Sequence, residues 1–202
     1  MAILSAVGLQ DWIVTTTTPR YSVACAHGRF QPLHNGHLEY LLAAKRQCRF
    51  LWIGITAVEQ PDAERARGTA RERRENNPLS YYERVSILDV ALRDIGVARD
   101  EFGFVPFPIE FPDRIANFVP PSVPCLTTIC EEWNRIKIGT LRGLGYEVVV
   151  LYERANKEIT GKFIRDDILL GGTEWRAKVP RATIEAVERL NVRARLTELR
   201  GT

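Results

Sequence analysis

The chain lacks most of the features that identify common protein classes. Its 202 residues contain no long hydrophobic run, no G-x-G-x-x-G and no G-x-x-x-x-G-K-[ST], which excludes a spanning helix, a dinucleotide fingerprint and a P-loop. The net charge of +3 is too small to indicate nucleic-acid binding. The four cysteines form no C-x-x-C pair and no zinc spacing with histidine. We therefore expect a protein of the reduced cytoplasm that binds neither nucleic acid nor membrane.

The first twenty residues read "MAILSAVGLQDWIVTTTTPR" and lack the basic start of a secretory signal. We interpret residues 1–20 as an N-terminal extension and residues 21–202 as one domain. A single domain suits a chain of 23.0 kDa with 45% hydrophobic residues. The polar stretch 57–77 is rich in arginine and predicts a long loop, since it shows no apolar periodicity.

Apolar runs and amphipathic segments alternate along the rest of the chain. The runs "YSVACA", "RFLWIGIT", "FGFVPFPI", "VPCLTTI" and "YEVVVLY" predict strands at 21–26, 49–56, 102–109, 123–129 and 146–152. Helices are predicted after residue 34 and over 77–96, 131–145, 161–170 and 180–191. This order predicts an α/β, Rossmann-like, doubly wound parallel sheet with C-terminal helices, whose ligands bind beyond the carboxyl ends of the strands.

All three histidines of the chain lie within the stretch "HGRFQPLHNGH", between the first strand and the first helix. His34 and His37 bracket Asn35 and Gly36 where the helix begins. A helix N-terminus carries free N–H groups and partial positive charge, and two imidazoles there can donate to phosphoryl oxygens. Gly36 has no Cβ and allows a base or sugar to approach. The loop therefore predicts phosphoryl or nucleotidyl transfer by positioning and charge stabilisation.

The H-x-G-H loop after a strand resembles that of the HxGH nucleotidyltransferase superfamily. Within it, "GRFQPLHNGHLEYL" is most similar to archaeal-type nicotinamide mononucleotide adenylyltransferases. Three later segments, "ENNPLSYYERVSIL", "ITGKFIRDDI" and "GGTEWRAKVPRATIEAV", resemble further segments of that family in the same order. The resemblance covers about residues 22 to 190 and identifies the domain as a nucleotidyltransferase domain.

The resemblance implies a role for each matching residue. His34 and His37 contact the triphosphate, Arg29 contacts a phosphate or the acceptor, and Arg165 supports the departing pyrophosphate. Thr160 heads the helix that holds the β- and γ-phosphates. The implied nucleotide-binding residues are Gly28, Arg29, Phe30, Gly36, Thr160, Gly161, Lys162 and Ile164. Mg²⁺ bridges the phosphates and is held by substrate and water, with no ligand from the protein.

The sequence departs from this family where the acceptor would bind. The family's Ser-Gly-Asn after the fourth strand is replaced by "TICEEWN", which brings Trp133 and Asn134, and its second signature carries Lys162 and Phe163 instead of Thr and Glu. We expect Trp133, Asn134 and the loop residues Arg71, Arg73 and Arg74 to bind the acceptor. Arginine forks and a lysine suit a small, highly charged oxyanion. For the arginine-rich loop, a solvated segment and an anion-gathering lid both remain open.

These departures favour a small phosphate or phosphonate as the acceptor. No residue names the base of the donor, and CTP is expected only from the following resemblance. Some antibiotic producers use enzymes that resemble the nicotinamide family to place CMP on phosphonoformate. One alternative is nicotinamide mononucleotide adenylyltransferase, making NAD from ATP. The alternative of another class is a non-catalytic nucleotide sensor, against which intact His34, His37 and Arg165 argue. His27 matches no motif and is expected to be structural, and the oligomeric state stays open although related enzymes often assemble.

Overall fold

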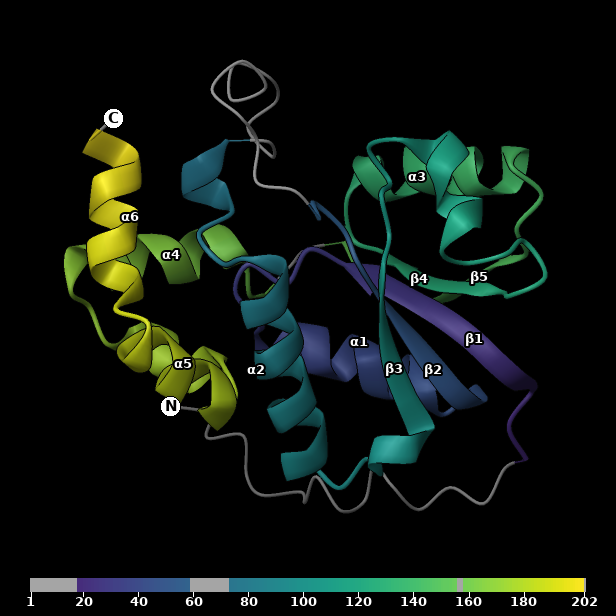
Figure 1. Ribbon diagram of the computed structural model, residues 1–202, viewed down its shortest axis with the longest axis horizontal. Helices are drawn as coiled ribbons and strands as arrows, with labels where there is room; N and C mark the ends of the chain where they lie inside the picture. Colours follow the sequence, from purple (N-terminus) through teal and green to yellow (C-terminus); the bar gives the residue numbers. More distant parts are fainter. Residues whose placement is uncertain (1–17, 59–72, 156–157, 202) are drawn as a thin grey trace.

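The fold is built on one parallel sheet. A computed structural model describes residues 18–58, 73–155 and 158–201 of the chain. The five strands are β1 Tyr21–Gly28, β2 Cys48–Ile55, β3 Phe102–Pro106, β4 Cys125–Ile129 and β5 Val148–Glu153. They pair in the order β3-β2-β1-β4-β5, and every neighbouring pair is parallel (Figure 1). After β3 at one edge, the chain returns to the centre of the sheet and adds β4 on the other side of β1. The switch point of this doubly wound fold therefore lies between β1 and β4.

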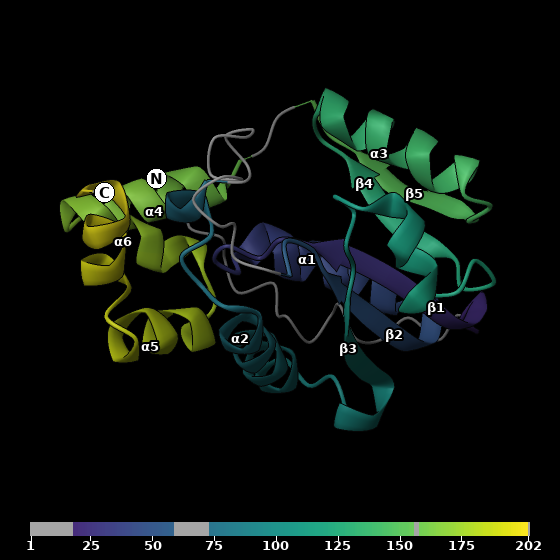
Figure 2. The same cartoon turned by 45° about the horizontal axis from the view of Figure 1, so that its top comes forward.

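Helices cover both faces of the sheet, as its strand order requires. Helices α1 (Asn35–Lys45) and α2 (Tyr81–Asp94) follow β1 and β2, and α3 (Glu132–Gly143) joins β4 to β5 on the opposite face (Figures 1 and 2). Short 3-10 turns lie at Arg74–Asn76, Arg99–Glu101, Pro112–Asn117 and Glu174–Lys178. The doubly wound α/β fold that the sequence predicts is confirmed.

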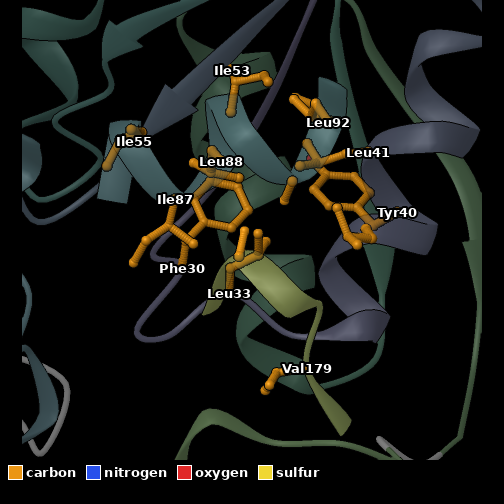
Figure 3. Packing of buried hydrophobic residues seen from close by; sticks show 14 of the residues in the cluster. Phe30, Leu33, Tyr40, Leu41, Ile53, Ile55, Ile87, Leu88, Leu92 and Val179 are labelled. Atoms are coloured by element: carbon orange, nitrogen blue, oxygen red, sulfur yellow. The ribbon is translucent and has the colours of Figure 1, made fainter. Parts of the chain in front are cut away.

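The central strand β1 contributes to two separate cores because successive side chains point to opposite faces. Ala24 and Ala26 belong to the larger core with α1, α2 and the C-terminal helices, part of which Figure 3 shows. Cys25 belongs to the smaller core beneath α3 and lies opposite Cys125 of β4. Burial on both faces explains why "YSVACA" reads as an almost unbroken apolar run. The buried cysteines are free thiols.

Three helices after β5 pack beside α2. They are α4 (Gly161–Leu170), α5 (Arg181–Arg189) and α6 (Val192–Gly201), and α5 lies against α2 (Figure 1). The first two agree with the predicted helices. The sequence did not predict α6, in which only Val192 and Leu196 are buried.

Most differences between predicted and observed bounds have a local cause. Helix α2 begins at Tyr81 rather than near residue 77, since Ser80 and Glu83 form a capping box. Strand β3 ends at Pro106, because a second proline follows at Pro108 and proline cannot donate to the ladder. Within the described residues, no helix is both long and apolar enough to cross a bilayer. The extension 1–20 and the loop 57–77 lie mostly outside those residues.

Candidate functional site

A groove of about 2640 Å³ runs along the carboxyl ends of the strands. Its walls come from the β1–α1 loop, the ends of β2 and β4, the start of α3 and the start of α4. Pockets for one small ligand usually measure about 300 to 1,000 Å³, so this groove has room for two substrates. It lies where a doubly wound fold is expected to bind its ligand.

The paired histidines form the floor of this groove. His34 is the N-cap of α1, and its Nδ1 accepts a hydrogen bond from the backbone N–H of His37 at 3.3 Å. The two imidazole rings stack with their centroids 3.6 Å apart and 16° between their planes. The ring of Phe30 packs edge-on against His37 at 5.1 Å. A Cβ on Gly36 would lie 3.3 Å from Nδ1 of His34, so glycine permits this close stack.

The capping bond determines which nitrogen of His34 can act on a ligand. Because Nδ1 accepts from the backbone, the proton of the neutral ring lies on Nε2, which is then a donor. The first turn of α1 contains no acidic residue. The donor nitrogen and the helix N-terminus therefore together favour an anion.

The start of α4 contacts the β1–α1 loop, although about 130 residues separate the two segments in the sequence. Thr160 is the N-cap of α4, and its Oγ1 accepts from the N–H of Phe163 at 3.2 Å. A Cβ on Gly161 would lie 2.8 Å from the carbonyl oxygen of Gln31. Only glycine allows the helix to approach the loop so closely. Two helix N-termini, those of α1 and α4, thus border the same groove.

Arg165 lies beneath the loop, and only 3% of its surface is exposed. Its Nη1 donates to the carbonyl of Gln31 at 2.6 Å, and its Nη2 donates to Oδ1 of Asn76 at 2.5 Å. Burial, followed by the nearby cation Arg29, lowers the pKa of Arg165 to about 10. The side chain remains charged at neutral pH, and it lines the groove together with Arg29.

The other residues expected to bind nucleotide divide into two groups. Gly28, Phe30 and Lys162 line the groove, and the amine of Lys162 donates to Asp166 at 2.6 Å. Ile164 does not line it, since its side chain is fully buried in the larger core and its N–H donates to the carbonyl of Thr160 at 3.2 Å. The side chain of Ile164 therefore packs in the core instead of lining the groove, and its role in nucleotide binding stays a prediction.

The expected acceptor residues are brought together only in part. Trp133 and Asn134 line the groove, and Oδ1 of Asn134 accepts from the N–H groups of Cys130 and Glu131 at 3.1 and 3.0 Å. That amide oxygen is therefore committed to capping α3. Arg73 and Arg74 are exposed and are not among the described residues of the groove wall. Arg71 lies outside the described residues.

His27 is buried on the face of β1 that carries α3. Its ring stacks on Phe107, with the centroids 4.2 Å apart and 8° between the planes. It is 3% exposed, and neither ring nitrogen has a hydrogen-bond partner among the described residues. Burial, with a smaller effect of Lys137, holds the pKa of His27 well below 6.5. His27 is therefore a buried neutral side chain that packs on Phe107 and also borders the groove, and its structural role stays a prediction.

Several groove residues carry no signal in the sequence. Arg114 and Lys137 add two cations to the wall near α3. Both lie in polar segments without a motif, so their position depends on packing. No cluster of three or more metal-ligating side chains occurs among the described residues.

Comparisons with known proteins agree with this geometry. Residues 25–104, which contain the histidine loop, match the family described as cytidylyltransferase-like. A phosphonoformate cytidylyltransferase of Streptomyces viridochromogenes is 36% identical over 84% of this chain and 92% of its own length. A nicotinamide-nucleotide adenylyltransferase of Ignicoccus hospitalis is 27% identical over 85% of this chain and 94% of its own.

Solved structures share the fold at low sequence identity. A putative nicotinate-nucleotide adenylyltransferase of Vibrio parahaemolyticus is 12% identical with a TM-score of 0.54, over 86% of this chain and 95% of that one. A bifunctional NMN adenylyltransferase/ADP ribose pyrophosphatase of Francisella tularensis, complexed with AMP and a manganese ion, is 17% identical with a TM-score of 0.55. That alignment covers 77% of this chain but only 44% of the larger protein.

Proposed function

The chain belongs to the cytidylyltransferase-like family and is a nucleotidyltransferase, and from this we propose that it transfers the cytidylyl group of CTP to a small phosphonate or phosphate. The observation that carries the proposal is the 36% identity to a phosphonoformate cytidylyltransferase over nearly the full length of both chains. The adenylyltransferase of Ignicoccus hospitalis shares 27% over a similar length.

The reaction needs no covalent intermediate on the protein. An oxygen of the acceptor attacks the α-phosphorus of CTP in line, the bond from that phosphorus to the bridging oxygen of the β-phosphate breaks, and pyrophosphate leaves. Charge accumulates on the non-bridging oxygens of the α-phosphate and on the leaving group. The protein therefore has to position two anions and stabilise that charge.

The described residues can do this from two sides. Nε2 of His34 and the imidazole of His37 donate to the α-phosphate, over the N-terminus of α1. The N-terminus of α4 at Gly161 receives the β- and γ-phosphates, with Lys162 as an added cation. Arg165 donates to the carbonyl of Gln31, which lies between these two helix ends. In this proposal the positive charge of Arg165 supports the departing pyrophosphate.

We propose that Mg²⁺ enters with the triphosphate. The described residues offer no cluster of protein ligands, which fits an ion held by phosphate oxygens and water. When bound, such an ion neutralises phosphate charge. The neighbour of known structure from Francisella tularensis contains manganese.

We infer that the acceptor binds on the α3 side of the groove. Arg114, Lys137 and the half-exposed Trp133 line this side, and cations are suited to a phosphonate that carries a second acidic group. Nicotinamide mononucleotide is the alternative acceptor, with ATP as donor, on the strength of similarity to the adenylyltransferases.

The experiment that tests the proposal measures pyrophosphate release with Mg²⁺. CTP and ATP are each combined with phosphonoformate, a simple alkyl phosphonate, inorganic phosphate or nicotinamide mononucleotide. Release with CTP and phosphonate supports the proposal. Release only with ATP and nicotinamide mononucleotide would replace it by NAD synthesis, and nucleotide binding without release for any pair would favour a sensor.

A further inference from the structure

Two residues in the loops that flank the groove adopt a left-handed backbone that is unfavourable for their side chains. Phe30 after β1 has a φ of 52°, and Ala57 after β2 has a φ of 49°. Such positions persist only where the surrounding structure holds them. The turn at Phe30 is also tight, since a Cβ on Gly28 would lie 2.8 Å from the Phe30 ring. That ring in turn supports His37.

One buried guanidinium contacts both strained segments. Nη1 of Arg84 donates to the carbonyls of Arg29 at 3.0 Å and Thr56 at 2.6 Å, and Nη2 donates to the carbonyl of Ala57 at 2.7 Å. Its Nε donates to the carbonyl of Ser80, the N-cap of its own helix, at 3.2 Å. The planar fork of arginine thereby links the ends of β1 and β2 to the start of α2.

Arg84 is 1% exposed, and its four acceptors among the described residues are neutral carbonyls. Burial lowers the pKa of Arg84 to about 10, with a further effect of Arg29, so the group is charged at neutral pH. Burying a cation is costly unless it is well hydrogen-bonded. Its four bonds meet that condition, and they place positive charge beneath the loop that faces the groove.

Arg165 completes the support from the other side. Arg84 holds the carbonyl of residue 29 from α2, and Arg165 holds the carbonyl of residue 31 from α4. The side chain of Gln31 is itself fixed, because it donates to the carbonyl of Leu79 at 2.7 Å and accepts from its N–H at 3.0 Å. The backbone on both sides of Phe30 is thus held from beneath.

We propose that Arg84 is a positioning residue for nucleotide binding and transfer. It acts through the carbonyls of Arg29, Thr56 and Ala57 to hold the turn that aligns His34 and His37 with the triphosphate. This inference rests on the proposed role of that turn as a nucleotide site, and it does not depend on which acceptor is used.

The test compares Arg84→Met and Arg84→Lys with a matched control, Arg195→Met. Arg195 of α6 also binds the start of α2, donating to the carbonyl of Pro78 at 2.9 Å and to Glu83 at 2.8 Å, but it does not contact the loop. Each variant is assayed for the Kd of CTP and ATP, for kcat and KM with the acceptor that the wild type uses, and for stability in urea.

Arg84→Met should lower kcat/KM for the nucleotide by ~10²-fold, as for a misplacement of about 1 Å at a reacting centre. Arg84→Lys keeps the positive charge but loses the planar fork of N–H donors. Its kcat/KM should therefore lie between those of Arg84→Met and the wild type. Arg195→Met should lower stability and leave Kd and kcat/KM unchanged. The acceptor's KM should be nearly constant in all three.

Equal kinetics for Arg84→Met and Arg195→Met, when both are folded, would overturn the inference. If Arg84→Met does not fold, Arg84→Lys with wild-type kinetics would overturn it as well. Failure of the proposed reaction is a separate result. Even when no acceptor reacts, the Kd of CTP or ATP still shows whether the turn at Phe30 is correctly placed for nucleotide binding. A wild type that binds neither nucleotide would overturn both.

Discussion

At the scale of single residues, the three histidines lie in two different environments. His34 and His37 stack at the N-terminus of α1 and face a groove. His27 is only seven positions before His34, yet its ring lies on the opposite core, against Phe107. The alternation of side chains along a strand explains the difference for His27, which points from β1 towards α3. His34 and His37 follow the turn after Gly28 and lie at the start of α1. Proximity in sequence therefore did not imply a shared packing environment.

The substitution His37→Ala should lower turnover by ~10²–10³-fold, since it removes one preorganised donor to the charge that develops on the α-phosphate. Pyrophosphate release at saturating nucleotide is the measurement, and urea unfolding checks that the variant is folded. Near-normal turnover in a folded variant would rule out this role of His37.

The substitution His27→Leu should change how stability depends on pH. The pKa of His27 is well below 6.5 in the folded protein and returns to about 6.5 on unfolding, so below that pH the unfolded state binds an additional proton. The wild type should therefore lose stability relative to the variant as the pH falls below about 6.5, by up to about 1.4 kcal/mol per pH unit.

The free energy of unfolding in urea, from about pH 7.5 to about pH 5, measures this difference. His34 and His37 are present in both proteins, so the comparison isolates the effect of residue 27. A constant difference between the two proteins across this range would show that His27 titrates as it does in the unfolded chain.

At the scale of elements, the site depends on two helix ends that the fold brings together. Helix α1 follows the loop directly, whereas α4 comes from the far end of the chain and touches the carbonyl of Gln31 through Gly161. The C-terminal helices hold α4 in this position, since α6 packs on α4 and α5 packs on both α6 and α2. Helix α6 therefore contributes to a groove that it does not line.

The substitution Leu196→Ala should lower the free energy of unfolding by about 2 to 5 kcal/mol, because Leu196 is fully buried and its loss leaves a cavity beneath α6. Urea unfolding measures the change. Leu170→Ala is the matched control, since Leu170 at the end of α4 is 81% exposed and should change stability by less than about 0.5 kcal/mol. Equal effects of the two substitutions would place α6 outside the folded core.

At the scale of the whole molecule, the groove is bordered by elements from both faces of the sheet. Its walls include α1 and α4 on one face and α3 on the other, with β1 and β4 between them. Substrates that fill the groove would therefore contact both of the cores that the sheet separates. Binding should then stabilise the domain as a unit.

Addition of CTP and Mg²⁺ at about 100 times the dissociation constant should raise the free energy of unfolding by about 2.7 kcal/mol, in one cooperative transition. Urea unfolding with and without nucleotide measures this increase, and thermal unfolding should show a rise in Tm. His37→Ala should need a higher nucleotide concentration for the same increase. The absence of any increase with CTP or ATP would argue against a nucleotide site in the groove.

Much of the fold and part of the site could be predicted from the sequence because the signals are local. The bounds 161–170 agree with α4, whose start and end are set by Thr160 and by Gly171 in a left-handed conformation. The loop from Gly28 to His37 lies at the groove as its motif indicated. Helix α6 was missed because "VRARLTELRG" shows only two buried positions and no clear apolar stripe.

The sequence by itself determined the order of the five strands and of the helices up to α5, and it determined the histidine loop, because hydrophobic period, caps and motif spacing act over a few residues. Only the tertiary structure decided that Ile164 packs in the core, that His27 is a neutral residue of the other face, and that Arg84 and Arg165 hold neighbouring carbonyls of one loop. Every residue type has a backbone carbonyl, so the sequence does not show which carbonyl accepts a hydrogen bond from a buried guanidinium. Such contacts arise between segments tens of residues apart, and only the packing of the sheet and its helices brings them together.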